Sequence, residues 1–264
     1  MSADALTSEA VAPLLETGWL GRAWRHVASC GSTNDEAARW AKEGAPAGAV
    51  VVADSQTRGR GRLGRVWHSP PGESLYLSVV LRPRLVPSLV PPVTLAAGVA
   101  VAEAIARFEV EPALKWPNDV LASGRKAAGI LTEMATAQGA VEHLVIGIGV
   151  NLNGLAFPDE LAAIATSLRR ERGGAPIDRP AFAAALCERL EAWYEVFESG
   201  GAPAVAAGWR RFARFFGQRL TVAQGGGTVS GVAEALEDDG ALRLRADDGR
   251  LVRVIAGEVV ASCD

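Results

Sequence analysis

The residues best suited to chemistry gather in one stretch, Gln56 to Trp67, which reads QTRGRGRLGRVW. It holds four arginines and three glycines, and it follows an apolar run from Ala49 to Ala53. Arginine offers a planar fork of donors that suits a phosphate or a carboxylate. Glycine lets the backbone approach a ligand closely. The stretch therefore predicts a mobile loop, here called the lid, that closes over a small anionic molecule.

The lid also matches the dinucleotide-binding pattern, as Gly59-x-Gly61-x-x-Gly64. That pattern needs a helix directly after the strand and an acidic residue about 20 positions further on. Here the lid runs into a turn, residues 68–72, and then into a strand-like segment, Ser74 to Leu81. This strand–loop–strand context argues against a Rossmann site. A basic nucleic-acid patch is also disfavoured, because the rest of the chain lacks supporting basic or aromatic surface.

Ser32 and Thr33 begin a segment that predicts a helix running toward Glu43 and ending at Gly44. Thr33 and Glu36 fit a capping box. The two hydroxyls either only cap the helix or also meet a ligand at its positive end, and the local sequence leaves both interpretations open.

Lys115 and Asp119 flank a Trp-Pro corner between two strand-like pieces. A lysine there could contact a phosphate and the carboxylate could hold Mg²⁺, although a solvated surface pair explains them equally well. Lys126 begins the second strand of a predicted hairpin, where an ordinary exposed lysine is the alternative. Alternate glycines in Gly147 to Asn151 suit either a backbone wall against a flat ligand or plain close packing.

The surrounding pattern predicts an α+β fold. Residues 92–108 form an alanine-rich buried helix, and Pro180 to Phe197 and Pro203 to Phe215 form two more. Leu190, Trp193, Tyr194 and Phe197 recur at helical spacing and are interpreted as core rather than as a cofactor box. From Gln218 the chain turns to short alternating strands, which predict a separate small β-barrel of roughly fifty residues.

Composition narrows the class of protein. The chain has 264 residues, a formal net charge of −3 and 49% apolar residues, which suits a folded core and gives no global attraction to nucleic acid. Cys30, Cys187 and Cys263 are far apart, as expected for reduced thiols in a cytoplasmic protein. We expect no signal peptide, and apolar stretches such as Val93 to Ala102 are too short to span a membrane.

These motifs together resemble the biotin–protein ligases. The resemblance covers Trp24 to Asn153 strongly and the C-terminal barrel more loosely. The five matching motifs are Ser32-Thr33-Asn34, Gln56 to Trp67, Lys115-Trp116-Pro117-Asn118-Asp119, Arg125 to Leu131 and Gly147 to Asn151. One such motif is weak evidence, but five in order at matching spacing are highly specific.

The resemblance implies a mixed β-sheet with flanking helices, similar to class II synthetases, in a catalytic domain of residues 1–216. An SH3-like barrel follows in residues 217–264. It also implies ATP-dependent attachment of biotin, through biotinyl-5′-AMP, to a lysine of a biotin carboxyl carrier protein of acetyl-CoA carboxylase or a related carboxylase. ATP, Mg²⁺ and biotin are the implied small molecules.

The resemblance assigns roles to named residues. The implied catalytic residues are Lys126, Arg60 and Arg62. Biotin would be bound by Ser32, Thr33, Gln56, Gly59, Arg60, Arg62, Lys126 and Gly129. The nucleotide would be bound by Arg62, Arg65, Trp67, Lys115, Asn118 and Asn151, and Mg²⁺ by Asp119. The positive side chains would bring two anions, carboxylate and triphosphate, together against their repulsion.

Some members of the family carry an N-terminal helix-turn-helix domain that represses transcription. Only about 25 residues precede the catalytic pattern, too few for such a domain, so we expect a ligase that binds no DNA. A biotin-responsive regulator and a lipoate or octanoate transferase of the same fold are the alternatives; the lid sequence argues against the transferase. Whether the protein is a monomer or a homodimer is left open.

Overall fold

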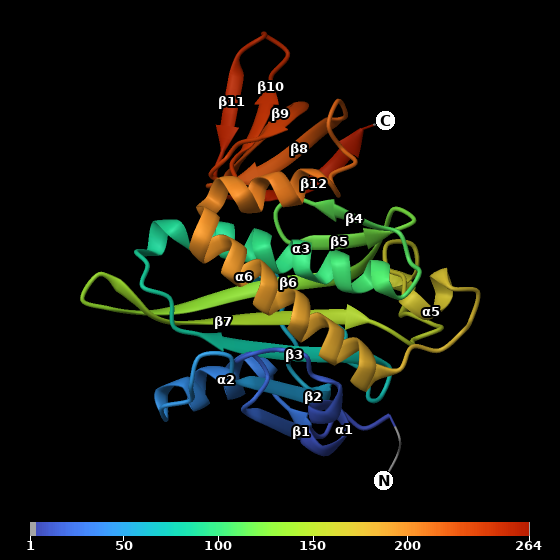
Figure 1. Cartoon of the computed structure of the whole chain (residues 1–264). Coiled ribbons are helices and arrows are strands. Elements are labelled where there is room, and N and C mark those ends of the chain that lie inside the picture. The colour runs from blue at the N-terminus through green and yellow to red at the C-terminus, as the bar shows by residue number, and fades with distance from the viewer. Residues whose placement is uncertain (1–3, 264) are drawn as a thin grey trace.

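A seven-stranded mixed sheet forms the larger part of the computed structural model, which describes residues 4–263 (Figure 1). Its strand order is β1-β2-β3-β7-β6-β5-β4. Only β1 and β2 are parallel, and every other neighbouring pair is antiparallel. The strands are β1 Trp24–Cys30, β2 Val50–Gln56, β3 Ser74–Leu81, β4 Pro112–Lys115, β5 Asp119–Ala122, β6 Arg125–Ala137 and β7 Ala140–Asn151. The predicted mixed sheet is confirmed.

Helices cover both faces of this sheet, and alternation along the strands decides which side chains each helix meets. On one face lie α3 (Pro91–Arg107) and α6 (Arg179–Arg210), which run side by side (Figure 1). On the other lies α2 (Thr33–Lys42), in a separate apolar cluster with Val51, Val80 and Val145. The candidate site described below lies on the same face of the sheet as α2, at the N-terminal end of that helix.

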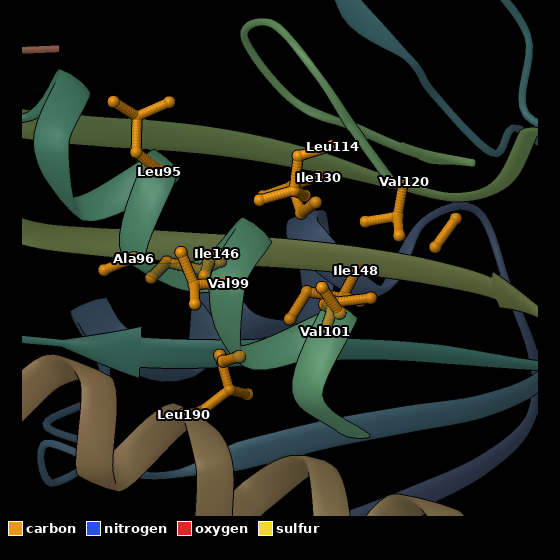
Figure 2. Close-up of a cluster of buried hydrophobic side chains, with 14 of the residues drawn as sticks. Leu95, Ala96, Val99, Val101, Leu114, Val120, Ile130, Ile146, Ile148 and Leu190 are labelled. Atoms are coloured by element: carbon orange, nitrogen blue, oxygen red, sulfur yellow. The ribbon is translucent and has the colours of Figure 1, made fainter. Parts of the chain in front are cut away.

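Helix α3 makes the centre of the core. Val99 and Val101 lie beside the strand side chains Ile146 and Ile148, in the same buried cluster as Leu95 and Ala96 (Figure 2). Together with the turn before it, the segment Pro87–Arg107 is 21 residues long and contains an 18-residue window with a mean hydropathy of 1.8, so by length and composition alone it could cross a membrane. The predicted apolar stretch, Val93 to Ala102, is therefore only part of a longer apolar helix. Burial accounts for its composition, because 72% of that window lies inside the protein.

The two helices predicted in the C-terminal half are the two parts of α6, which is broken at Gly201, where φ is 65°. The first carries the predicted core side chains, of which Leu190, Tyr194 and Phe197 are buried. The second ends at Arg210, earlier than the predicted Phe215. Shorter helical segments are α1 Ser8–Val11, η1 Ala12–Leu14, η2 Arg62–Gly64, η3 Pro87–Leu89, α4 Asp159–Ala162 and α5 Leu168–Glu171.

A separate five-stranded antiparallel sheet of order β11-β10-β9-β8-β12 packs against the end of the first (Figure 1). Its strands are β8 Arg219–Gln224, β9 Gly227–Leu236, β10 Leu242–Arg245, β11 Leu251–Val254 and β12 Glu258–Cys263. The buried indole Nε1 of Trp116 donates to Gly240 O at 3.1 Å and joins the two sheets. The separate C-terminal domain is confirmed, and its boundary between residues 216 and 217 stays a prediction.

The described cysteines are free thiols. Cys30 is half-buried and Cys187 is buried, and burial raises the pKa of the Cys187 thiol to about 12. The side chain of Cys263 lies outside the described residues. Within residues 4–263 no three acidic, histidine or cysteine side chains are grouped as metal ligands.

Candidate functional site

The floor of the site is a part of the α2 face of the sheet where glycines replace side chains. Gly129 of β6 pairs with Gly149 of β7, and Gly147 lies two residues before it on the same face. A Cβ atom added at Gly147 would lie 2.1 Å from Asn34 Oδ1, and one at Gly149 would lie 2.4 Å from Trp67 Cε2. The flat group on this backbone wall is thus the protein's own indole. Any side chain larger than hydrogen would displace it.

One hollow opens above this floor, and a second, larger one lies beside it. The larger, of about 800 Å³, lies between the two sheets and is lined by Lys115, Asp119, Asn151 and residues of the C-terminal domain such as Glu258. The smaller, of about 50 Å³, lies under the lid. The residues that line both hollows are Gly61, Arg62, Trp67, Asn118 and Lys126. The two hollows therefore meet at one boundary.

The smaller hollow is edged by a chain of hydrogen bonds from α2 to the lid. Thr33 N–H donates to Gln56 Oε1 at 2.9 Å, and Gln56 Nε2 donates to Ser69 Oγ at 3.0 Å. Ser69 Oγ in turn donates to Trp67 O at 2.9 Å. The predicted capping box is wrong: Ser32 is the N-cap and makes no side-chain capping bond. Gln56 takes over the cap because β2 brings its side chain to the first turn of α2.

Two polar residues that we did not predict, Ser78 and Glu133, complete this edge together with Asn34 of the first motif. Ser78 Oγ, fully buried, lies 2.8 Å from Thr33 Oγ1 and 2.7 Å from Asn34 Oδ1. Asn34 Nδ2 donates to Glu133 Oε2 at 2.6 Å. A serine inside the apolar run of β3 was a signal for Ser78, whereas nothing local distinguishes Glu133 in its strand.

Arg60 of the lid points to carboxylates. Its guanidinium donates to both oxygens of Asp35, at 2.7 and 2.8 Å, and lies 3.3 Å from Glu133. These contacts lower the pKa of the Asp35 carboxyl from its ordinary value, and the hydrogen bond from Arg60 is the largest cause. Arg60 also lines the smaller hollow. The lid is thereby fastened to α2 and β6.

The lid folds back on itself around this pair. Gly61 N–H donates to Arg65 O at 2.7 Å, and Trp67 N–H donates to Gly59 O at 2.9 Å. Gly59 lines neither hollow, and a Cβ there would lie 2.5 Å from Trp67 O. Its role in this structure is close packing within the lid, against Trp67. Leu63 at the tip has a φ of 55° and is 74% exposed.

At the boundary between the hollows, Lys126 Nζ lies 2.6 Å from Asp119 Oδ1 and 5.3 Å from the centre of a Trp67 ring. Arg62 Nη1 donates to Asn118 Oδ1 at 3.2 Å. Burial lowers the pKa of the Arg62 guanidinium, while Glu258 and Asp119 act to raise it. Asn118 also donates from Nδ2 to Ile130 O at 2.7 Å, which orients the amide.

The remaining predicted residues line the larger hollow. Arg65 forms an ion pair with Glu258, so the lid also reaches the C-terminal domain. Asn151 Nδ2 donates to Thr166 O at 3.0 Å and to Lys126 O at 3.4 Å. These bonds commit its nitrogen to the backbone and leave Oδ1 as the atom available to the hollow. The structure thus brings Arg65, Asn151 and Lys115 to one cavity.

The arrangement suits a reaction between two anions. Within the described chain, Arg62, Arg65, Lys115 and Lys126 bring positive charge to the larger hollow, and Arg62 and Lys126 extend it into the smaller one. Preorganised cations of this kind stabilise charge that develops during a displacement at phosphorus. The hydrogen-bond donors and acceptors of Thr33 and Gln56 line the smaller hollow and suit a small polar group of a ligand.

Comparisons with known proteins show which family the chain is similar to. Residues 27–151 match the model of the biotin/lipoate A/B protein ligase family, and residues 215–261 match the biotin protein ligase C-terminal domain. A biotin–[acetyl-CoA-carboxylase] ligase of Mycobacterium tuberculosis is 39% identical over 250 residues, which are 91% of this chain and 90% of that protein. The bifunctional ligase/repressor BirA of Bacillus subtilis is 38% identical over 221 residues, which are 83% of this chain and 68% of that protein.

Among solved structures, the biotin protein ligase of Aquifex aeolicus in complex with biotin and ATP superimposes with a TM-score of 0.79. It is 27% identical, and the match covers 90% of this chain and 97% of that one.

Proposed function

This chain belongs to the biotin/lipoate A/B protein ligase family, in its biotin–protein ligase branch, and we propose that it attaches biotin to a lysine of a biotin carboxyl carrier domain. The reaction has two steps. A carboxylate oxygen of biotin attacks the α-phosphorus of ATP, and the bond to the β-phosphate breaks, which yields biotinyl-5′-AMP and pyrophosphate. The amine of the carrier lysine then attacks the acyl carbon, loses a proton to solvent and releases AMP.

The observation that carries this proposal is the meeting of the two hollows at Lys126. Lys126, Arg62, Trp67 and Asn118 line both hollows. We assign biotin to the smaller hollow, where its head group would meet Ser32, Thr33 and Gln56, and the nucleotide to the larger one. The carboxylate of biotin and the α-phosphate would then meet at the boundary. Lys126 can contact both there and offset the charge on the transferring phosphoryl group.

Trp67 has to move for biotin to enter. Pockets for small molecules are on the order of 300 Å³ or more, and the smaller hollow measures about 50 Å³. The indole of Trp67 lies on Gly149 within it, and Nε1 is buried without a hydrogen-bond partner among the described residues. Displacing the ring therefore breaks no hydrogen bond of Nε1. We propose that biotin takes this place and that Trp67 then packs on the nucleotide side.

The residues of the larger hollow fit a magnesium ion that is held mostly by phosphate oxygens and water. Asp119 is a carboxylate of the hollow at its boundary, and one of its oxygens contacts Lys126. Mg²⁺ commonly uses one or two carboxylates together with substrate phosphates. Asp119 and the oxygen of Asn151 are the residues that we expect to hold it. The ion would supply positive charge against the triphosphate.

The direct test mixes the protein with biotin, MgATP and an isolated biotin carrier domain, and follows the mass of the carrier lysine by mass spectrometry. We expect the mass gain of one biotinyl group, lost in Lys126→Ala. Absence of transfer at saturating ligands would refute the proposal. Competition between biotin and lipoate in a pyrophosphate-release assay separates this activity from a lipoate ligase. Inhibition by lipoate at equal concentration would favour the latter.

A carboxylase carrier domain is the partner that we propose. The relatives from Mycobacterium tuberculosis and Paracoccus denitrificans are named for ligation to acetyl-CoA carboxylase. The lid presents Leu63 and Val66, which are 74% and 83% exposed, and Val66 lines the larger hollow. These apolar side chains suit contact with a folded domain that inserts its lysine there.

A further inference from the structure

The backbone of Lys126 is held by a segment that lies about forty residues further along the chain. Lys126 N–H donates to Ile164 O at 2.8 Å, and Thr166 N–H donates to Lys126 O at 2.9 Å. Both peptide groups that flank the Lys126 Cα are thus satisfied by the short stretch 164–166. Asn151 Nδ2 donates to the carbonyls of both Lys126 and Thr166, and so adds a further link between Lys126 and this stretch.

A single carboxylate, Glu171, fastens this stretch in place. It accepts from Ser123 Oγ at 2.6 Å, from Arg125 Nη2 at 2.9 Å and from Thr166 Oγ1. Ser123 and Arg125 belong to the hairpin turn that leads into Lys126, and Thr166 belongs to the stretch that brackets it. Glu171 therefore joins the two pieces of chain that hold the Lys126 backbone, one before it and one beside it.

The Glu171 carboxyl is well suited to hold several donors at once. Its side chain is only 11% exposed. Burial acts to raise its pKa, but the hydrogen bonds from Ser123 and Thr166 and the charge of Arg125 outweigh burial and lower the pKa below the ordinary value. The group is an anion at neutral pH with three donors around it. Replacing it by an amide would leave the Arg125 charge without a partner.

Lys126 needs such support because its side chain is long and flexible. Its ammonium group lies 2.6 Å from Asp119 Oδ1. A catalytic group must be held within about 0.5 Å of its productive position, and a flexible side chain reaches that precision only from a fixed backbone. The bonds around Lys126 fix its backbone, while Asp119 fixes the direction of Nζ.

We propose that Glu171 is a positioning residue for the adenylation step, and that it acts through Lys126 by fixing residues 123–126 against residues 164–166. The inference rests on the proposed function, since it gives Lys126 the part described above. Glu171 lines neither hollow and is expected to contact neither biotin nor ATP.

The first test is a double-mutant cycle in single-turnover formation of biotinyl-5′-AMP, with Glu171→Gln, Lys126→Ala and the double variant. We expect Glu171→Gln to lower the rate roughly 10- to 100-fold with little change in KM for biotin or ATP. In the Lys126→Ala background the same change should add almost nothing, because a group that acts through Lys126 has nothing left to position. Equal losses in both backgrounds would overturn the proposal.

A matched control is Glu109→Gln. Glu109 is 80% exposed and pairs with Arg172, the neighbour of Glu171, at 2.9 Å. Its variant should keep the wild-type rate. A loss as large as that of Glu171→Gln would show that any ion pair of this segment matters, and the specific role of Glu171 would be refuted.

The second test does not depend on activity. Hydrogen exchange at the amides of Lys126 and Thr166 should be faster in Glu171→Gln than in the wild type and in Glu109→Gln, since the variant loosens both bonds. Unchanged exchange would overturn the proposal even if activity fell. A wild-type protein that forms no biotinyl-5′-AMP would instead refute the proposed function, and the exchange measurement would still show whether Glu171 holds the Lys126 backbone.

Discussion

Lys126 Nζ and Asp119 Oδ1 lie 2.6 Å apart, at the boundary where the two hollows of the site meet. The pair joins neighbouring strands, since Asp119 begins β5 and Lys126 lies near the start of β6. Without ligands, the carboxylate keeps the ammonium group pointed into the site. With two anionic substrates present, Lys126 would have new partners, and Asp119 would be released to a cation.

Removing the Lys126 charge should abolish most of the chemistry. We expect Lys126→Ala to lower the rate of pyrophosphate release on the order of 10²–10³-fold, because a preorganised cation at the transferring phosphoryl group is lost. The melting temperature should change little. Lys42→Ala, at an exposed position near the end of α2, is the control and should keep full activity. Activity in Lys126→Ala equal to that of Lys42→Ala would contradict the assignment.

A methyl group at Gly149 should push the Trp67 indole off the sheet. The added Cβ would lie 2.4 Å from Cε2 of the ring, so the ring has to shift, and overpacking of this kind costs about 1–3 kcal/mol. We expect Gly149→Ala to red-shift the fluorescence emission of Trp67. The Trp67→Phe variant identifies that emission as the part of the spectrum that it lacks. Gly18→Ala, whose Cβ would have its nearest neighbour at 3.6 Å, is the matched control. An unchanged spectrum in Gly149→Ala would place the ring elsewhere.

The Arg60–Asp35 pair should keep the lid closed in the empty protein. We expect Asp35→Asn to speed limited tryptic cleavage after Arg62 and Arg65 several-fold at neutral pH, because the guanidinium loses a bidentate partner. Asp159→Asn, in the short helix α4, serves as the control. Equal cleavage in the two variants would argue that other contacts close the lid.

The same pair predicts how closure depends on pH. The folded-state pKa of Asp35 is lowered from its ordinary value of 3.8, so its contribution is fully present above that value and is lost as the pH falls through the lowered one. Lid protection measured across the neutral range should therefore not vary with pH. It should weaken with added salt, because both side chains are partly exposed. A loss of protection on going from neutral to mildly acidic pH would point to a different group.

Trp116 should tie the C-terminal domain to the catalytic sheet. We expect Trp116→Phe to lower stability by about 1 kcal/mol or more, because the Nε1 bond to Gly240 O is lost and the buried carbonyl stays unpaired. Thermal unfolding measures the change. Trp40→Phe is a useful control, since no hydrogen bond of its Nε1 is found in the described part of the chain. An equal shift in both variants would assign the effect to packing.

Local patterns predicted the elements well. The helix at Thr33–Lys42, the strands Ser74–Leu81 and Ala140–Asn151 and the long apolar helix Pro91–Arg107 follow from periodicity, capping residues and turn residues close by in the chain. The capping box failed for an informative reason. Thr33 is capped by Gln56, 23 residues away, and such a bond depends on how β2 and α2 pack.

The amino-acid sequence by itself determined the chemistry of the lid, its place between two strands and the order of the family motifs, because residue type and short-range spacing carry that information. Only the tertiary structure decided which partners those residues meet. Strand register set Gly129 beside Gly149, packing laid Trp67 over them, and the fold brought Asp35 and Glu133 to Arg60. Glu171 reaches the turn before Lys126 in the same way. These contacts join distant segments, so they depend on pairing and packing that no local pattern encodes.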